Sequence, residues 1–144
     1  EGAADYDDVV GEVHRFLAER IFAAEMAGVA RRNIVVDPGF GFGKTTAHNL
    51  QLLAQLRRFT ELGVPVLAGL SRKKTIGELT GREGPRERIF GSLAAHLVAA
   101  QNGAMLLRVH DVAATVDALK VWNAVAALPA PRKDAGKPEI AWPE

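Results

Sequence analysis

The sequence of 144 residues contains no cysteine, which excludes disulfide bonds and thiolate-bound zinc. It has no His-Glu-x-x-His spacing, and no apolar run approaches the roughly 20 residues that a membrane-spanning helix needs. No secretory leader is recognisable after Glu1. The net charge of +1 argues against an extended nucleic-acid-binding surface. We therefore expect a cytoplasmic protein that has neither a membrane nor a nucleic acid as its partner.

What the sequence does contain is an alternation of helical and strand patterns. Apolar residues recur with helical spacing over residues 5–27, 47–62, 71–79, 85–102 and 111–128. Short apolar runs at 33–37, 64–68 and 104–109 are typical of strands covered on both faces. This alternation predicts parallel strands in the α/β class, either in an open doubly wound sheet or in part of a TIM-type (β/α)8 barrel. Residues 1–128 would form this domain. Residues 129–144 hold four of the seven prolines and would form a flexible tail.

Three finer predictions follow from the helical patterns. The helix over residues 71–79 would be capped by Ser71. The core face of the helix over residues 85–102 would consist of Ile89, Leu93, Leu97 and Ala100. The histidines that we expect to be structural are His14, His48 and His96.

The first predicted strand runs into a glycine-rich stretch, DPGFGFGKT, at residues 37–45. A Walker-type phosphate loop needs four residues between its first glycine and its Gly-Lys pair, whereas three separate Gly39 from Gly43. Pro38 also lacks the backbone N–H that such a loop would use. A plain flexible turn would explain the glycines, but neither the two phenylalanines nor Asp37. A carboxylate followed by glycines and aromatic rings suits a flat heterocycle, because the carboxylate accepts from ring N–H and amino groups while phenyl faces pack on the ring.

Polar residues also follow the other two predicted strands. The sequence GLSRKK at residues 69–74 places three adjacent cations at a helix start, as a solvated basic turn or as a site for an anion or heterocycle. Arg108 and His110 are two residues apart, so strand alternation puts them on one face, where they would recognise an oxyanion. A structural role is the alternative for His110. Because the carboxyl ends of parallel strands form the ligand face of such folds, we expect one site built from three strand ends.

These motifs resemble those of the dihydropteroate synthases, the folate-pathway enzymes that sulfonamides inhibit. DPGFGFGKT, GLSRK and RVHDV occur in the order and at the spacing of that family, as do GPRER at residues 84–88 and GSLAAHLVAAQNGA at residues 91–104. The resemblance covers roughly residues 6–126. It implies a (β/α)8 barrel, dimeric through its last helices, that joins 4-aminobenzoate to (7,8-dihydropterin-6-yl)methyl diphosphate and releases pyrophosphate.

The resemblance implies that five residues bind the pterin. Asp37 would hold its amino group and ring N–H, and Phe42 would flank the pocket. Gly69 would lie against the ring, and Lys73 would bond its polar edge. Arg108 would stack on the other side of the ring.

The resemblance assigns the diphosphate to Arg108 together with His110, and the aminobenzoate region to Ser71 and Arg72. The next position is often serine in relatives and contacts the aminobenzoate carboxylate. Here it is Lys74, so that carboxylate would be bound by Lys74 itself or by a helix amide. No residue is assigned as catalytic, because positioning and electrostatics would do most of the work.

The resemblance also implies that this sequence is the C-terminal portion of a barrel. It would begin just before the helix that follows the fifth strand, and three parallel strands cannot close a barrel. The absent strands would carry further pterin-binding groups and most contacts to a magnesium ion on the diphosphate, so we expect no metal ligand here. Alone, the chain should lack synthase activity and should self-associate, as a homodimer or otherwise, through apolar helix faces or unpaired strand edges.

Three alternatives remain open from the sequence. A pterin-binding methyltransferase domain shares the barrel and a related Asp-Pro-Gly site. A non-catalytic half-barrel that docks on a partner would ignore pterins. A nucleotide-binding protein is the weakest alternative, given the spacing of the glycines.

Overall fold

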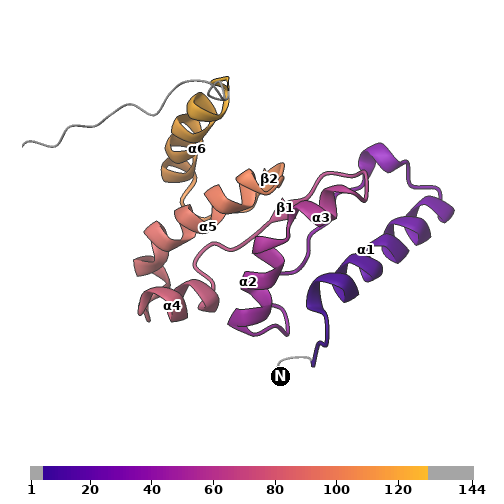
Figure 1. The fold of residues 1–144 in the computed structure, drawn as a ribbon, viewed down its shortest axis with the longest axis horizontal. Coiled ribbons are helices and arrows are strands. Elements are labelled where there is room, and N and C mark those ends of the chain that lie inside the picture. The colour runs from indigo at the N-terminus through magenta and orange to yellow at the C-terminus, as the bar shows by residue number, and fades with distance from the viewer. Residues whose placement is uncertain (1–4, 130–144) are drawn as a thin grey trace, which may run out of the picture.

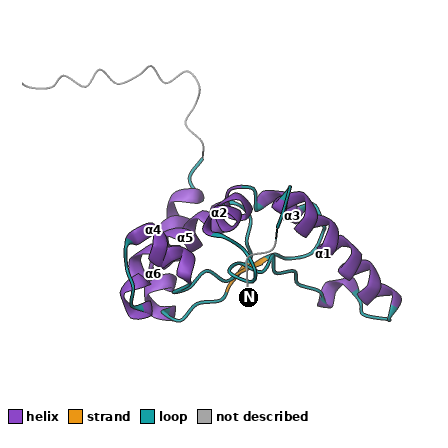
Figure 2. Ribbon diagram, turned by 90° about the horizontal axis from the view of Figure 1, so that it is seen from below, coloured by secondary structure: helices purple, strands orange, loops and turns teal. Residues whose placement is uncertain are grey.

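Helices and short parallel strands alternate along the chain in a computed structural model that describes residues 5–129 (Figure 1). The strands lie on the inner side of an arc of helices (Figure 2). The predicted alternation of helix and strand is therefore confirmed. The elements are α1 (Val9–Met26), η1 (Arg31–Asn33), α2 (Thr46–Ala54), α3 (Arg57–Thr60), β1 (Leu67–Ala68), α4 (Lys74–Thr80), η2 (Pro85–Arg88), α5 (Ile89–Gln101), β2 (Leu106–Leu107) and α6 (Val112–Ala126).

The strands pair in parallel, but they are shorter than predicted. β1 pairs with β2, with Leu67 opposite Leu106, and Val36 forms a single parallel bridge to Val66 on the other side of β1. The prediction of a full strand over residues 33–37 is wrong, because the chain makes a 3-10 turn at η1 and pairs only at Val36. Within the described residues the segment makes this one bridge and no longer ladder.

Side chains fix where the first helices begin and end. The Asp8 carboxylate accepts a hydrogen bond from Gly11 N at 3.0 Å and caps α1, which is followed by Gly28 with a left-handed φ of +94°. α2 starts at a capping box: Thr45 Oγ1 accepts from His48 N, and His48 Nδ1 accepts from Thr45 N. His48 thus has the structural role expected of it. These caps hold the two helices that flank the glycine loop.

Three helix predictions need correction. The helix predicted over 47–62 is broken into α2 and α3, and at the break the Leu53 carbonyl accepts from Leu56 N at 3.4 Å and from Asn102 Nδ2 at 2.8 Å. α4 begins at Lys74, and Ser71 does not cap it, since the Ser71 hydroxyl contacts His110 instead. The residues of α5 predicted as its core face are only partly buried, and the buried ones are Ser92, Ala95, His96 and Ala99.

The core lies between the helices and the strands. It joins one face of α1 to α2, α3 and the strand segments through Leu52, Leu56, Phe59 and Val66, all at most 1% exposed. His96 is buried in it, with Nε2 accepting from Leu70 N at 3.2 Å and Nδ1 lying 2.8 Å from the Ser92 carbonyl oxygen. No helix among residues 5–129 is both long and apolar enough to span a bilayer. The predicted proline-rich tail, apart from Pro129, lies outside the described residues.

Candidate functional site at three strand ends

The structure brings Asp37, Lys73 and Arg108 together from three separate strand ends. Arg108 Nη2 lies 3.3 Å from Asp37 Oδ2, and Asp37 Oδ1 accepts from Gly39 N at 2.9 Å. Arg108 and Lys73 line one cavity of about 150 Å³ together with Gly69, Ser71, Val109 and His110. Asp37 does not line this cavity, but its ion pair with Arg108 places it beside the cavity. The convergence expected from the sequence is therefore present, while the ligand-binding roles of these residues stay predictions.

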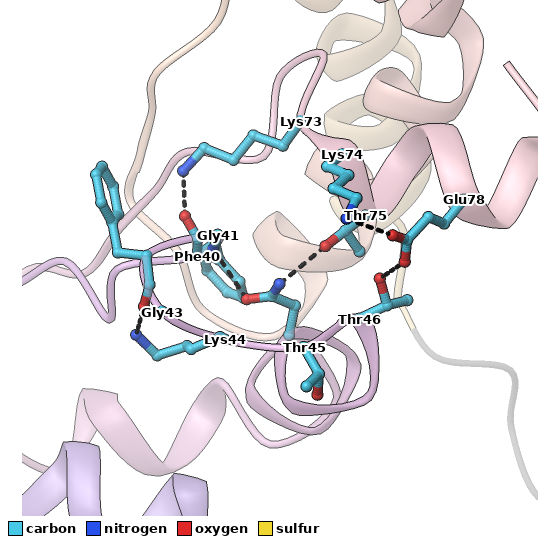
Figure 3. A pocket seen from close by; sticks show the side chains of 12 residues that line it. Phe40, Gly41, Gly43, Lys44, Thr45, Thr46, Lys73, Lys74, Thr75 and Glu78 are labelled. Atoms are coloured by element: carbon cyan, nitrogen blue, oxygen red, sulfur yellow. Dashed lines mark hydrogen bonds and ion pairs between the residues drawn. The ribbon is translucent and has the colours of Figure 1, made fainter. Parts of the chain in front are cut away.

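Lys73 crosses from the start of α4 to the glycine loop (Figure 3). Its Nζ donates to the Phe40 carbonyl and lies 4.9 Å from the centre of the Phe42 ring. Burial, assisted by repulsion from Arg108, lowers the pKa of Lys73, and the carboxylate of Asp37 opposes that shift. Because a more acidic ammonium is a stronger hydrogen-bond donor, Lys73 is suited to donate to a ligand at this site.

The two phenylalanines of the glycine loop have different surroundings. Phe40 is 1% exposed and belongs to the core, whereas Phe42 is 69% exposed beside Lys73. The expectation that both rings would pack on a ligand is therefore wrong for Phe40. Phe42 remains available as a wall of the pocket.

A buried amide supports the glycine loop from below, and the sequence analysis did not identify it. Asn49 of α2 is 2% exposed, its Oδ1 accepts from Gly41 N at 3.0 Å, and its Nδ2 donates to Thr75 Oγ1 at 2.8 Å. Lys44 also bonds the loop, donating to the carbonyls of Gly39 and Phe42 at 2.9 and 3.2 Å. Burial lowers the pKa of Lys44, and Asp37 opposes this shift. An asparagine in the middle of a helical pattern was the only sequence signal for this support.

Gly69 lies directly under the guanidinium of Arg108. A Cβ at this position would stand 2.6 Å from Arg108 Nη2 and 3.1 Å from Cζ, closer than side chains approach one another. The absence of a side chain therefore lets Arg108 lie across the end of β1 and reach Asp37. This is a packing reason for the glycine in GLSRK, in addition to the contact with a ligand that the resemblance implies.

Ser71 and His110 join the ends of β1 and β2. The Ser71 hydroxyl is buried, accepts from His110 N at 3.1 Å and lies 2.8 Å from His110 Nδ1. Arg72 makes a two-pronged ion pair with Asp111, with Nε–Oδ2 at 3.1 Å and Nη2–Oδ1 at 2.7 Å. These hydrogen bonds raise the pKa of Arg72 and lower that of Asp111. Arg72 therefore points toward Asp111, and the sequence did not reveal this partner.

Lys74 lies at the edge of a larger cavity of about 560 Å³ between the glycine loop and α4 (Figure 3). Its Nζ is 3.3 Å from Glu78 Oε1, and Glu78 Oε2 accepts from Thr46 Oγ1. The hydrogen bond from Thr46, followed by that from Lys74, lowers the pKa of Glu78. The cavity thus has a cation close to its wall, held by a carboxylate at its mouth.

The described residues do not form a metal site by themselves. In residues 5–129 no three His, Cys, Asp or Glu side chains are grouped so that they could hold a metal ion. The acidic groups at the rim, Asp37 and Asp111, are each paired with an arginine. The donor set therefore does not fit magnesium without other groups.

Comparison with known proteins places this geometry in a family. The sequence profile described as "Pterin binding enzyme" matches residues 1–110. The dihydropteroate synthase of Escherichia coli (strain K12) is 49% identical over 122 residues, which are 85% of this chain and 43% of that protein. The structure of Xanthomonas albilineans dihydropteroate synthase with 4-aminobenzoic acid is 74% identical with a TM-score of 0.87, over 88% of this chain and 46% of that one. The same enzyme in complex with 7,8-dihydropteroate is 74% identical with a TM-score of 0.86, over 87% and 48%.

The chain spans less than half the length of these relatives. Its close superposition on the Xanthomonas enzyme, together with the parallel strands, confirms the prediction of a partial (β/α)8 barrel. The resemblance that the strand-end motifs indicated is confirmed as well. The chain belongs to the pterin binding enzyme family, and the relatives that it matches there are dihydropteroate synthases.

Proposed function

We propose that this chain contributes the ends of three strands to the active site of a dihydropteroate synthase. The enzyme would join 4-aminobenzoate to (7,8-dihydropterin-6-yl)methyl diphosphate, with release of pyrophosphate. The observation that carries the proposal is the meeting of Asp37, Lys73 and Arg108 at one rim. A carboxylate, an ammonium and a guanidinium at neighbouring strand ends match the donors and acceptors of a pterin ring and the charge of a diphosphate.

The side chains account for the chemistry in outline. Asp37 would accept from the pterin amino group and ring N–H, Lys73 would donate to the polar edge of the ring, and Gly69 and Phe42 would border it. The C–O bond to the diphosphate breaks with both electrons staying on oxygen, and the amine nitrogen forms the new C–N bond and then loses its proton. Arg108 and His110 would stabilise the departing anion, so electrostatic stabilisation and positioning supply the catalysis.

The cavity of about 560 Å³ beside Lys74 is where we place 4-aminobenzoate. Lys74 would meet its carboxylate, or the first amides of α4 would, whereas Ser71 and Arg72, which the resemblance assigned to this region, do not line this cavity. Sulfonamide inhibition belongs to the same proposal, because these compounds would occupy the aminobenzoate position. Magnesium would neutralise charge on the diphosphate, and its ligands would have to include groups outside the described residues. The cytoplasmic location expected from the sequence is also part of this proposal.

Calorimetry with 6-hydroxymethylpterin tests the assignment of the pterin site. The wild-type chain should bind it, and Asp37→Asn should weaken binding about tenfold or more, since a hydrogen bond to a charged group contributes about 1.5–3 kcal/mol. Asp117→Asn, on the exposed face of α6, is the matched control and should bind like wild type. Absence of binding by the wild-type chain would contradict a pterin site at these strand ends, and would favour a non-catalytic interaction module.

Catalytic activity and inhibitor binding separate the remaining alternatives. The 144-residue chain should form no dihydropteroate from the two substrates, because three strands do not close a barrel. Measurable product would overturn this expectation. A methyltransferase domain would bind a pterin but no sulfonamide, so binding of a sulfonamide in the presence of a pterin distinguishes the synthase.

Self-association is the partner that we propose for this chain, as a homodimer in the first instance. Large apolar side chains are exposed on the outer helices, including Phe22 at 65% and Met26 at 73% on α1, and Val121 at 68% and Val125 at 65% on α6. Such surface is usually covered by another chain. Light scattering should therefore give a mass above 15.4 kDa, and a monomer at high concentration would contradict the proposal.

A further inference from the structure

The second strand end holds a residue in an unusual backbone conformation. Arg72 has a φ of +57° and is the one non-glycine residue with a left-handed backbone in the part of the chain that the structure describes. A side chain disfavours this conformation, which persists only where surrounding contacts hold it. Arg72 lies between Ser71 and Lys73, so its conformation sets the direction in which both neighbours leave the loop. The contacts that hold Arg72 therefore bear on the whole rim.

Two residues of the η2–α5 segment bracket the peptide groups of Arg72. Ser92 Oγ accepts from Arg72 N at 2.9 Å, and Arg88 Nη1 donates to the Arg72 carbonyl at 2.9 Å. Ser92 Oγ in turn donates to the Arg88 carbonyl at 2.6 Å, which connects the two residues. Both backbone polar groups of the left-handed residue are thus bonded by one short segment of chain.

All three nitrogens of the Arg88 guanidinium donate hydrogen bonds to backbone carbonyls. Besides the Arg72 carbonyl, its Nε donates to the Arg82 carbonyl at 2.9 Å and its Nη2 to the Glu83 carbonyl at 2.6 Å. The group lies over the surface of α4 at Gly77, where a Cβ would stand 2.5 Å from Arg88 Nε and 2.7 Å from Cζ. Only a planar group with several diverging donors can bond three carbonyls in this way.

The backbone conformation of Arg72 also determines its contact with the residues that follow β2. From this backbone the Arg72 side chain reaches Asp111 with both prongs of its fork. Asp111 directly follows His110, whose backbone N–H and ring Nδ1 both contact Ser71. Residues 71–72 and 110–111 are therefore locked together by two adjacent cross-connections.

We propose that Arg88 is a positioning residue of this site. It holds Arg72 in the left-handed conformation and thereby fixes the Ser71–His110 and Arg72–Asp111 connections, although Arg88 does not line the rim cavity. That the positioned rim receives a pterin rests on the function proposed above. The positioning itself does not, so it can be tested without any ligand.

Hydrogen exchange of the 15N-labelled 144-residue chain tests the proposal. In Arg88→Ala, the amides of Arg72 and His110 should lose about tenfold or more of their protection, while those of Leu67 and Met105 in the paired strands should keep theirs. The Nε–H signal of Arg72, bonded to Asp111 in wild type, should move and exchange faster. Arg86→Ala, an exposed arginine of the same turn, is the matched control and should change none of these signals.

A second substitution tests whether the left-handed backbone is the point of action. Glycine adopts a positive φ without penalty, so in an Arg72→Gly background the loop no longer needs to be held. There, adding Arg88→Ala should change the exchange of the residue 72 and His110 amides less than about twofold. An equal effect of Arg88→Ala in both backgrounds would overturn the proposal, as would equal loss of protection in the paired strands.

Two more variants keep the test decisive if Arg88→Ala fails to fold. Arg88→Lys keeps the charge, but its single nitrogen cannot take the places of Nε, Nη1 and Nη2, so it should show the same selective loss at residues 72 and 110. Gly77→Ala leaves Arg88 unchanged but places a methyl group where its guanidinium lies, and it should reproduce the effect. Wild-type exchange at both amides in either variant would overturn the proposal.

Discussion

The loops that follow Val36 and β1 both turn through left-handed backbone, but they hold it in different ways. The first loop uses glycines for it, with φ of +78°, +83° and +60° at Gly39, Gly41 and Gly43. The second places Arg72 there and relies on Arg88 and Ser92 to hold its peptide groups. The first conformation is therefore encoded within the loop itself. The second depends on residues that lie 16 and 20 positions away.

The two loops also make different kinds of contact at the site. The carbonyls of the glycine loop are bonded by two lysines, Lys44 at its own end and Lys73 from the start of α4. In the second loop the side chain of Arg72 is itself a connector, since it pairs with Asp111. A loop of glycines can approach a ligand closely, whereas a loop held by an arginine can fix a neighbouring strand end.

The largest effect is expected for Asn49→Ala, which removes the support of the glycine loop. The variant leaves the Gly41 N–H and the Thr75 hydroxyl without the partners that they have now. Two such losses in a buried place should lower the free energy of unfolding by about 2–4 kcal/mol. Chemical denaturation measures it. Thr75→Val removes one of the two bonds and should have about half the effect, and equal stability of Asn49→Ala and wild type would show that the loop needs no such support.

Alanine at two glycines of the first loop should separate backbone strain from contact. Gly41→Ala forces a side chain into a φ of +83° and brings it 3.1 Å from Lys73 Cδ, whereas Gly43→Ala meets nothing within 4 Å at a φ of +60°. Both should lose about 1–2 kcal/mol of stability from strain. Gly41→Ala should lose more, and it alone should disturb Lys73. Equal losses would mean that the Lys73 side chain moves away from the new methyl group at no cost in stability.

The sequence predicted the first loop better than the second for this physical reason. Glycines, Asp37 and the phenylalanines stand next to one another in the chain, so their common purpose is visible in nine residues. Arg72 gives no sign that it is left-handed, because its supports come from another helix. The parallel order of the strand segments was also predictable from alternation, but their length was not. The 3-10 turn at η1, which leaves the first segment with a single bridge at Val36, had no signal in the apolar pattern.

Protonation of His96 at low pH should lower the stability of the fold near the second loop. Burial lowers the pKa of His96 below its ordinary value of 6.5, so the unfolded chain binds a proton there more readily than the folded one. Stability should therefore fall as the pH decreases below about 6.5, and should stop falling on this account below the folded-state pKa. Protonation also ends the acceptance of the Leu70 N–H by Nε2. Denaturation at a series of pH values should show a shallower slope for His96→Gln than for wild type, and identical slopes would exclude His96 as the cause.

The smallest effect is expected at Lys74, which lies between the two loops but holds neither. Its ammonium is 3.3 Å from Glu78 with 89% of its side chain exposed, so water and salt screen the pair. Lys74→Met keeps the length of the side chain and leaves the Thr46–Glu78 hydrogen bond in place. Denaturation should hardly distinguish it from wild type, while binding of 4-aminobenzoate should weaken if the carboxylate uses this charge. Unchanged binding would move the carboxylate to the amides of α4. A clear loss of stability would instead show that the Lys74–Glu78 surface ion pair stabilises the loops. It would contradict the view that Asn49 and Arg88 supply that stability.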